Sequence, residues 1–407
     1  MTEDYRPLPL EGLRVMDLGQ FIAVPFCTLW MAWLGAEVIV VESGGRMTAR
    51  GAPPFAAGHD GNPDASGYYN TLYAGKKSCA LDLGSAAGRD VALRLASVCD
   101  VMVDNFSTGV MEKLGLGYDV VSKANPGLVV LSNGAFGRTG PMKDARGLHS
   151  TVNLFSGVAD VTGYTDGAPR ILGGVVPDPL SGMYAHFAIL AAFHHRERTG
   201  CGQYIDFAMY EAMMTLIPEA VIDYTLNGTQ PRRIANRDRQ MAPHGYYPCA
   251  DNDTWLAVSI RDDAMWLAFC KAMDRPDLAE DPRYATSTAR VENVEQLDRH
   301  VEAWSRQQDT DAAVELLQRA GVVAGAVLRN DELFGNEQLK ALGMIVAPDH
   351  PVTGPYQQIG LPWQMDSLRA EYRRAPLLGE HTHEIITGLL GMSQAEFEAL
   401  RDAGALT

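Results

Sequence analysis

The stretch LRVMDLGQFIAVPFCTLWMAWLGAEVIVVE (residues 13–42) decides the fold. Its two ends, residues 13–18 and 37–42, are short apolar runs that predict buried strands. The segment between them, residues 25–34, is apolar enough for a buried helix, and Gly35 closes it. A strand, a helix and a second strand in close succession predict a parallel unit, because parallel strands need a crossover connection that is usually a helix.

The same alternation continues downstream and predicts an α/β fold, a Rossmann-like parallel sheet with helices on both faces. Further strands are expected at 100–104, 128–131 and 204–209, and helices at 89–98 and 180–193. In such sheets, ligands bind beyond the carboxyl ends of the strands. The turn after the first strand has no G-x-G-x-x-G pattern, so an ordinary NAD site is not expected there.

The length of 407 residues predicts about two domains. Residues 1–224 are expected to form the first part of the large Rossmann-like domain. A polar stretch at 226–245 resembles a linker, and the strands and helices around it predict a smaller α+β domain over 225–330. Residues 331–407 form a last segment of turns and short strands that ends in a helix.

The composition limits the partners. A formal net charge of −16 disfavours nucleic acid, although a local group of Lys and Arg can still bind a small anion. The six scattered cysteines show no C-x-x-C spacing, which disfavours a metal site or a disulfide framework. The N-terminus lacks a signal-peptide pattern, and no apolar run approaches the ~18 residues that span a bilayer. We therefore expect a soluble cytoplasmic protein with no nucleic-acid or membrane partner.

Asp178 stands before Pro179 at the start of a strongly apolar helix. The local pattern favours a helix N-cap followed by Pro at the first helical position. A carboxylate there lies near backbone N–H groups and the positive end of the helix dipole, which should lower its pKa and keep it ionised. A carboxylate nucleophile must also be ionised, so the local pattern leaves a structural role and a catalytic role both open.

Other polar residues are also ambiguous by themselves. His149 fits a structural position, or one that positions a substrate or transfers a proton. Arg46 and Arg50, like Lys76 and Lys77, lie near predicted strand ends and are either solvated charges or ligands for a phosphate or carboxylate. Residues 105–109 follow a strand and precede a helix, as in many anion-binding loops.

Six short motifs follow one another along the chain. They are PLEGLRVMD (9–17), LGAEVI (34–39), GKKS (75–78), DVMVDNF (100–106), RERTGCGQ (196–203) and APLLGEHT (375–382). In this order they resemble the class III CoA-transferases, the family of formyl-CoA transferase and the carnitine CoA-transferases. The resemblance covers nearly the whole chain.

The resemblance implies that Asp178 is the catalytic nucleophile. Its carboxylate would attack the thioester of an acyl-CoA donor and form a mixed anhydride, which the released CoA thiolate would convert to an aspartyl-CoA thioester. The acceptor carboxylate would then attack, and CoA would be passed on. Backbone N–H groups would stabilise the oxyanions. Coenzyme A and acyl-CoA are substrates in this scheme, and the resemblance implies no tightly bound cofactor and no metal.

The resemblance also implies contacts with CoA. The positions that match these contacts are Ile22, Ala23, Leu81, Asn105, Phe106, Ser107, Lys113 and Arg146. Ile22 and Val24 depart from the Gln-Ala-Gly-Pro turn that is frequent in the family, and His149 stands where many members have an acidic residue. We therefore do not expect formyl or oxalyl transfer. We expect a dicarboxylic or aryl-substituted acid as acceptor, with Arg46, Arg50 and His149 as candidate ligands for a second carboxylate.

Two alternatives remain open. The same fold hosts 2-methylacyl-CoA racemases, which use a His and an Asp as a proton-transfer pair; His149 and Asp178 are spaced roughly as that pair, with His shifted by one place. The second alternative is that the chain is one subunit of a hetero-oligomeric CoA-transferase, as in the succinyl-CoA:benzylsuccinate transferases. The family architecture implies an interlocked homodimer, in which residues 331–407 return to the large domain.

Overall fold

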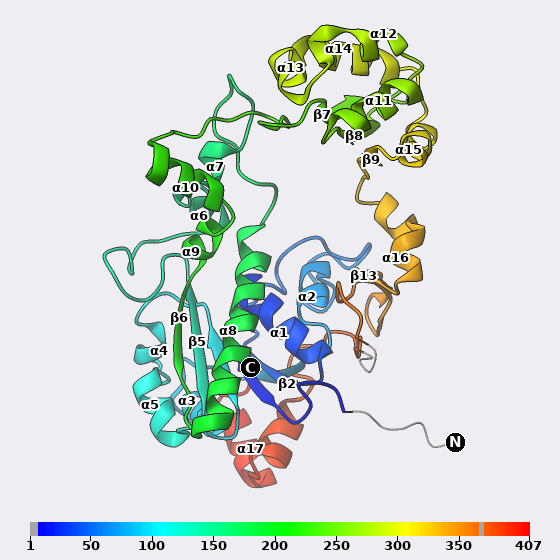
Figure 1. The fold of residues 1–407 in the computed structure, drawn as a ribbon. Coiled ribbons are helices and arrows are strands. Elements are labelled where there is room, and N and C mark those ends of the chain that lie inside the picture. Colours follow the sequence, from blue (N-terminus) through cyan, green and yellow to red (C-terminus); the bar gives the residue numbers. More distant parts are fainter. Residues whose placement is uncertain (1–6, 366–369) are drawn as a thin grey trace. The chain divides into compact units, whose positions relative to one another are not determined.

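The computed structural model describes residues 7–365 and 370–407 (Figure 1). The described residues fall into two compact units. The larger unit consists of Met1–Ala159, Ile171–Gln230 and Gln338–Thr407, and the smaller unit of Asp160–Arg170 and Pro231–Glu337. The smaller unit thus includes a short segment from well upstream, which no sequence pattern indicated.

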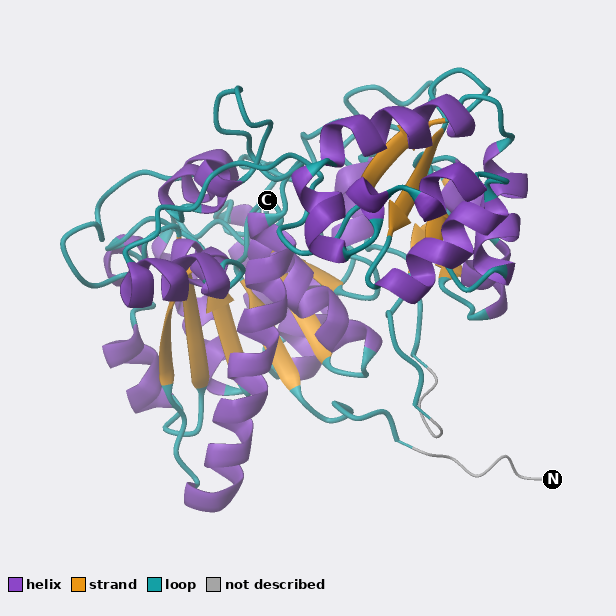
Figure 2. Cartoon of the chain, turned by 45° about the horizontal axis from the view of Figure 1, so that its top comes forward, coloured by secondary structure: helices purple, strands orange, loops and turns teal. Residues whose placement is uncertain are grey.

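Six parallel strands in the order β3-β2-β1-β4-β5-β6 form the sheet of the larger unit (Figure 2). The strands are β1 (Arg14–Asp17), β2 (Glu37–Glu42), β3 (Lys77–Ala80), β4 (Val101–Asp104), β5 (Val129–Gly134) and β6 (Tyr204–Ala208). The predicted parallel sheet is confirmed. The strand order reverses between β1 and β4, and the carboxyl ends of strands at such a switch point form the crevice where these folds bind ligands. The apolar pattern missed β3 because its sequence, KSCA, begins with two polar residues.

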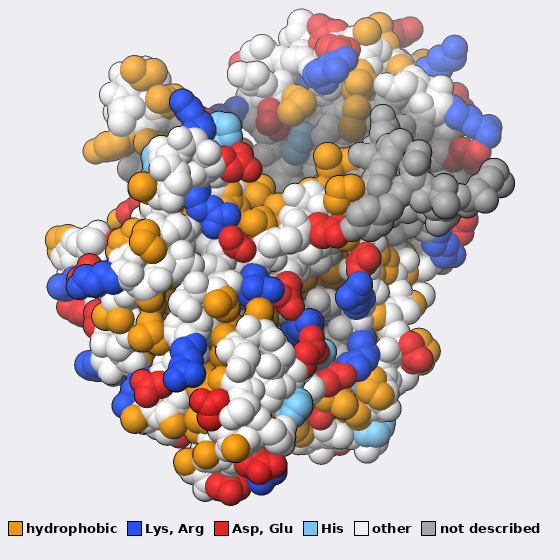
Figure 3. All heavy atoms as spheres, turned by 90° about the horizontal axis from the view of Figure 1, so that it is seen from below, with side chains coloured by type: hydrophobic (Ala, Val, Ile, Leu, Met, Phe, Trp, Pro, Cys, Tyr) orange, Lys and Arg blue, Asp and Glu red, His pale blue; other side chains and the backbone are white. Residues whose placement is uncertain are grey.

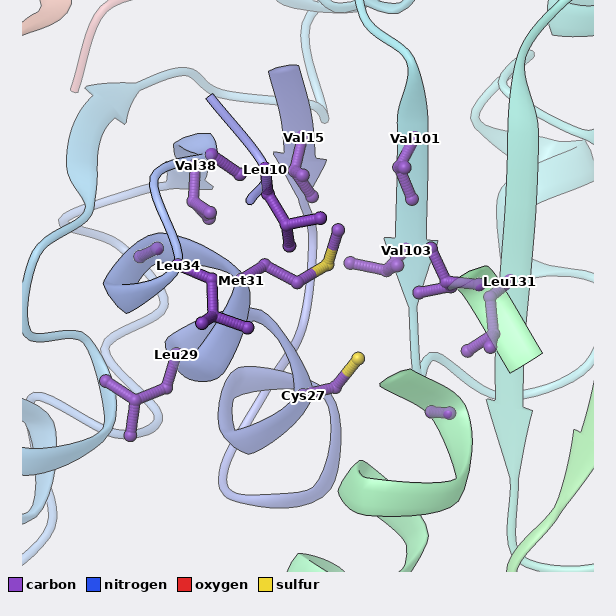
Figure 4. Close-up of a cluster of buried hydrophobic side chains, with 14 of the residues drawn as sticks. Leu10, Val15, Cys27, Leu29, Met31, Leu34, Val38, Val101, Val103 and Leu131 are labelled. Carbon is purple, nitrogen blue, oxygen red and sulfur yellow. The ribbon is translucent and has the colours of Figure 1, made fainter. Parts of the chain in front are cut away.

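Alternate strand residues face opposite sides of the sheet. On one side, Val15, Val103 and Leu131 share a buried cluster with α1 (Ala23–Trp33) and α8 (Pro177–Thr199) (Figure 4). Figure 1 shows α1 and α8 running next to each other, and they pack extensively. This layer therefore determines where α8 begins relative to the start of α1.

The opposite side of the sheet contacts a second layer. Met16, Met102 and Val130 belong to its buried cluster. The helices that contribute to it are α3 (Ala86–Ser97), α5 (Tyr118–Ala124) and the π-helix η3 (Glu384–Leu389). Because η3 lies near the C-terminus, this part of the chain contributes to the core of the larger unit.

Shorter elements complete the larger unit. They are α2 (Gly67–Leu72), α4 (Val110–Lys113), α6 (His149–Phe155), α9 (Met209–Met214), α10 (Pro218–Asn227) and α17 (Gln394–Asp402), with α7 (Val158–Val161) and α16 (Glu337–Ala341) at its boundaries. Two antiparallel pairs lie in its C-terminal part, β10 (Ile345–Val346) with β13 (Gln358–Ile359), and β11 (Asp349–His350) with β12 (Gly354–Pro355).

The smaller unit has its own antiparallel sheet, in the order β7-β8-β9, and its own core around Trp266 and Phe269. The strands are β7 (His244–Pro248), β8 (Trp255–Ser259) and β9 (Val323–Ala326). The helices are α11 (Asp263–Ala272), α12 (Pro276–Glu280), η1 (Pro282–Tyr284), α13 (Ser287–Glu292), α14 (Val294–Ser305), α15 (Thr310–Arg319) and η2 (Glu332–Gly335).

The surface carries charges of both signs. Figure 3 shows Lys and Arg side chains interspersed with Asp and Glu over one face. Several such side chains pair, among them Arg14 with Glu37 and Arg196 with Asp100. In the part of the chain that the structure describes, each helix is too short or too polar to cross a membrane.

Candidate active site

The turn after β1 and the loop after β4 meet at the switch point of the sheet. The backbone N–H of Gln20 donates to Oδ1 of Asn105 at 2.7 Å, and Nδ2 of Asn105 donates to the carbonyl oxygen of Gln20 at 2.7 Å. One Asn side chain therefore ties the two loops together. Asn105 is also one of the predicted CoA contacts, and the structure places it at the crevice.

A buried ion pair supports the turn after β1 from below. Asp17 ends the strand, and its Oδ2 accepts from Nζ of Lys76 at 3.0 Å and from Oγ1 of Thr28 at 2.6 Å. Its Oδ1 accepts from the N–H of Gly19 at 2.7 Å, and Lys76 also donates to the carbonyl oxygen of Pro25 at 2.9 Å. Asp17 and Lys76 thus hold both ends of the turn. Lys76 is neither a solvated charge nor free for a ligand, because its neighbours bury it completely.

The turn itself has an unusual backbone. Phe21 has φ of 59°, in the left-handed region that residues with a Cβ seldom adopt, and its side chain is half exposed. The hydroxyl of Tyr73 donates to the carbonyl oxygen of Gly19 at 3.2 Å and braces the turn from another side. Non-glycine residues in this conformation are often found at ligand sites, where the surroundings hold the strain. The turn leads directly into α1, whose first residue is Ala23.

Asp178 lies in the first turn of α8, but it is not the cap. The helix begins at Pro177, the N-cap is Val176, and no side chain caps it. The predicted N-cap at Asp178 is therefore wrong by two residues. Pro177 fits the first helical position as well as Pro179 does. The Asp178 carboxyl accepts from the N–H of Ala23, in α1, and from its own N–H.

Burial dominates the electrostatics of Asp178. Its side chain is 14% exposed, and burial raises the pKa of the carboxyl to about 6, although His149 and the N–H groups of Ala23 and Asp178 act to lower it. The predicted lowering of this pKa is thus wrong, because loss of solvent outweighs the helix N-terminus. Oδ2 is buried and has no hydrogen-bond partner among the described residues. At neutral pH the carboxylate is still mostly ionised, with a free oxygen.

The imidazole of His149 lies near that oxygen. It is the first residue of α6, and its Nδ1 lies 3.9 Å from Oδ2 of Asp178, beyond hydrogen-bonding distance. Its side chain is partly exposed, so it can also meet a substrate. The structure thus brings together His149, Asp178 and Ala23, which the sequence had proposed separately.

Close packing of α8 on α1 positions Asp178. Gly182 lies one turn after it, and a Cβ at this position would come within 2.7 Å of the carbonyl oxygen of Ala23 and 3.1 Å of the backbone nitrogen of Cys27. Only a glycine lets the two helices approach this closely. The approach brings the N–H of Ala23 within reach of the Asp178 carboxyl.

Tyr68, in α2, was not singled out from the sequence. Burial and the nearby charge of Asp178 together raise the pKa of its hydroxyl to about 12, so it stays protonated and can donate a hydrogen bond near the carboxylate. A tyrosine in a short helix, more than a hundred residues before Asp178, carries no local signal of this proximity.

The remaining predicted residues lie in different environments. Ile22 is buried at the start of α1, and Leu81 is buried in the α3 layer. Phe106 is half-buried just after β4, with Ser107 exposed beside it. Among the predicted site residues, three exposed basic side chains form no ion pair with a carboxylate of the described residues: Arg46, Lys113 and Arg146.

Arg50 has a structural role. Its guanidinium is buried and forks onto Glu42, with both N–O distances at 2.8 Å, and it reaches Asp64 at 2.6 Å. It also donates to the carbonyl oxygen of Pro376 at 3.0 Å. Because these acceptors occupy its donors, Arg50 is not available to a substrate carboxylate, contrary to the expectation from its position after β2.

Comparison with known proteins identifies the family of the chain. Residues 10–382 match the family described as CoA-transferase family III. The chain is 36% identical over 386 residues to a succinyl-CoA:mesaconate CoA-transferase of Haloarcula hispanica (93% of this chain, 95% of the relative). It is 31% identical over 402 residues to a succinyl-CoA–D-citramalate CoA-transferase of Chloroflexus aurantiacus (98% and 99%). A crystal structure of a CaiB/BaiF family protein from Brucella suis superposes with a TM-score of 0.87 at 30% identity, covering 94% of this chain and 100% of that one.

Proposed function

Because this chain belongs to CoA-transferase family III, we propose that it moves CoA from an acyl-CoA donor to a dicarboxylic acid through covalent intermediates on Asp178. The observation that carries the proposal is the Asp178 carboxylate itself. It is buried, has an oxygen without a hydrogen-bond partner, and lies against the switch point of a parallel sheet. A carboxylate oxygen without water or a hydrogen-bond partner is a stronger nucleophile than a solvated one.

The proposed reaction begins when Oδ2 of Asp178 attacks the carbonyl carbon of the donor thioester. The C–S bond breaks, CoA leaves as a thiolate, and an aspartyl-acyl anhydride remains. The thiolate then attacks the aspartyl carbonyl carbon and expels the donor acid as a carboxylate, which leaves an aspartyl-CoA thioester. The acceptor carboxylate repeats these two exchanges in reverse. Each exchange replaces one anion by another, so the sequence consumes no net proton and no electron.

A second carboxylate on the acceptor suits both the relatives and the site. The names of both relatives pair succinyl-CoA with a dicarboxylic acid. His149 is partly exposed within 3.9 Å of the nucleophile, and Arg46 is exposed in the segment after β2. We propose these two as ligands of the distal carboxylate and omit Arg50, which is already paired. An aryl-substituted acid is the weaker candidate, because neither relative names one.

For CoA itself, we propose the loop after β4 as the main contact. Asn105, Phe106 and Ser107 follow the strand next to the switch point, and Ser107 is exposed there. Lys113 and Arg146 are exposed cations that would bind phosphates. We also propose CoA contacts at Ile22 and Ala23, where α1 begins, and at Leu81, all three of which are buried.

We propose that a second copy of the chain covers α10, as in the interlocked homodimer expected from the sequence. Every residue of α10 is exposed or half-buried, although Ile222, Tyr224 and Leu226 are large apolar side chains. Sedimentation of the purified chain tests this: a dimer supports it, and a stable inactive monomer favours a hetero-oligomer. The cytoplasmic location stays a prediction.

The geometry favours transfer over racemisation. Two bases that act on opposite faces of one carbon must each stay within about 3 Å of its hydrogen-bearing position, so they lie roughly 6 Å apart. Nδ1 of His149 lies 3.9 Å from Oδ2 of Asp178, which is closer than this spacing. Incubation of a 2-methylacyl-CoA in deuterium oxide, without an acceptor acid, should therefore leave its α-carbon unlabelled.

A panel of acceptors tests the proposal. With succinyl-CoA as donor, we expect CoA transfer to four- and five-carbon dicarboxylic acids and little transfer to their monomethyl esters. Transfer to formate or to monocarboxylic acids at equal rates would contradict the assignment of a second carboxylate site. No transfer from any acyl-CoA donor would contradict the proposed reaction.

A further inference from the structure

Arg138 lies in the turn after β5, and its guanidinium points back across the ends of the strands. Its side chain is only 11% exposed. The turn is held from the other side, because the N–H of Arg138 donates to Oδ1 of Asp206, in β6, at 2.6 Å. The hydroxyl of Thr139 donates to Oδ2 of the same carboxylate at 3.0 Å. These two hydrogen bonds hold the backbone of Arg138 in place independently of its side chain.

The guanidinium joins the ends of two strands. Nη2 donates to Oδ1 of Asp104, the last residue of β4, at 2.9 Å and to the carbonyl oxygen of Asn133, in β5, at 3.2 Å. Nη1 donates to the carbonyl oxygen of Phe106, in the loop after β4. The planar fork of an Arg suits this set of acceptors, because its donors diverge in one plane.

Asp104 holds the same loop from its other side. Its Oδ1 accepts from the N–H of Phe106 at 3.1 Å, and its Oδ2 accepts from the hydroxyl of Ser132 at 2.5 Å. Asp104 is buried, and burial raises the pKa of its carboxyl while Arg138 and these hydrogen bonds oppose the change. The pair of Asp104 and Arg138 therefore binds the backbone of Phe106 at both its N–H and its carbonyl oxygen.

We propose that Arg138 is a positioning residue for CoA binding: through Asp104 and Phe106 it holds residues 105–107 in the conformation that accepts CoA. This inference rests on the proposed function, which assigns the CoA contact to that loop. Arg138 need not touch CoA, since all its contacts are internal. A loop that is ordered before the ligand arrives does not lose conformational entropy on binding.

Arg138→Met tests the inference, with Arg196→Met as the matched control. Arg196 pairs at 2.9 Å with Asp100, just before the opposite end of β4, and its side chain is also largely buried, at 22% exposed. We expect Arg138→Met to raise the Kd of CoA, measured by calorimetry, by about tenfold, the effect of one lost charged hydrogen bond. The KM for acyl-CoA should rise in parallel while kcat changes by less than about threefold. Arg196→Met should leave the Kd unchanged. An unchanged Kd in Arg138→Met would overturn the inference.

Arg138→Lys separates positioning from simple attraction of the CoA phosphates. A single ammonium cannot reach Asp104, Asn133 and Phe106 together, so positioning predicts a Kd close to that of Arg138→Met. A Kd close to that of the unmodified chain would mean that charge alone matters, and would overturn the inference. The proposed function is judged separately, by whether the unmodified chain transfers CoA at all. If it does and Arg138→Met binds CoA normally, only the inference fails.

Discussion

β1 and β4 are neighbours in the sheet, and each ends in a buried aspartate whose Oδ1 accepts the N–H of the residue two places on. Each aspartate also pairs with a basic side chain from another strand end, Asp17 with Lys76 and Asp104 with Arg138. The partners differ. The compact ammonium of Lys76 is fully enclosed and holds the turn that leads to Ala23, whereas the flat guanidinium of Arg138 reaches outward to the loop after β4.

This difference indicates that the two ion pairs have separate roles, one in the chemical step and one in CoA affinity. Lys76 supports the turn that carries the N–H of Ala23, which faces the proposed nucleophile Asp178, so a change at Lys76 should alter the chemical step. The Arg138 side supports the loop proposed to bind CoA, so its disturbance should change affinity. The turn after β1 and the loop after β4 remain linked, because Asn105 forms two hydrogen bonds with the backbone of Gln20. Each of the following changes tests one side of this comparison.

Removal of the proposed nucleophile should abolish CoA transfer and leave CoA binding intact. Asp178→Asn keeps the size of the side chain but removes the attacking oxygen. We expect CoA transfer to fall by about 10⁴-fold or more, as for other covalent nucleophiles. The Kd of CoA, measured by calorimetry, should stay within about threefold, because the loop after β4 is untouched. Substantial residual transfer would mean that another group attacks the thioester.

Removal of the enclosed cation should break the β1 side. Lys76→Met leaves Asp17 charged, buried and unpaired, which costs about 3–5 kcal/mol of unfolding free energy. Urea unfolding measures this loss, and the double variant Asp17→Asn with Lys76→Met should recover part of it by removing both charges. In the folded fraction of the Lys76→Met variant, kcat should fall by a larger factor than the KM for acyl-CoA rises. The reverse pattern would contradict the division between the two sides.

The pH dependence should follow Asp178. Its pKa is about 6, and only the ionised carboxylate attacks, so kcat/KM should fall by about tenfold per unit as pH drops below about 6. Stability should move in the opposite direction. The folded pKa lies above the ordinary value of 3.8, so the folded state gains stability while the carboxyl is protonated and loses it as pH rises toward 6.

The control for this pH effect is again Asp178→Asn. At pH 7 the variant should be more stable than the unmodified chain by up to about 3 kcal/mol, because it no longer buries a charge. The difference should shrink as pH falls toward 4. If the variant and the unmodified chain had equal urea midpoints both at pH 7 and at pH 4, Asp178 would not be desolvated as the structure indicates.

Separation of α1 from α8 should have the smallest effect. Gly182→Ala places a Cβ 2.7 Å from the carbonyl oxygen of Ala23, so the helices must part slightly, at a cost of about 1–3 kcal/mol. We expect a moderate fall in kcat and no change in the Kd of CoA. Gly173→Ala is the matched control, since a Cβ there meets no atom within 4 Å. Equal effects of both substitutions on kcat would remove Gly182 from the account.

The strands of the large sheet could be predicted well from the sequence, because they depend on the local pattern of apolar residues. Apolar runs identified β2 at its observed bounds and placed β1 and β4 within two residues. The family motifs singled out Asp178 and Asn105. These signals are written in consecutive residues, so neither needs knowledge of the folded chain.

The electrostatics could not be predicted in this way, because the partners are distant in sequence. Lys76 lies 59 residues from Asp17, and Arg138 lies 34 residues from Asp104. Arg50 seemed available for a ligand until the fold brought the carbonyl oxygen of Pro376 against it. The pKa of Asp178 was predicted to fall because the helix start is visible in the sequence, whereas the burial that raises it is not.

Trapping of the proposed aspartyl intermediate tests the role of Asp178. The chain is incubated with succinyl-CoA, treated with hydroxylamine or borohydride, digested and analysed by mass spectrometry, with Asp178→Asn in parallel. We predict a modified Asp178 in the unmodified chain and no modification of that peptide in the variant. A label on another residue, or no label while CoA transfer proceeds, would contradict the account.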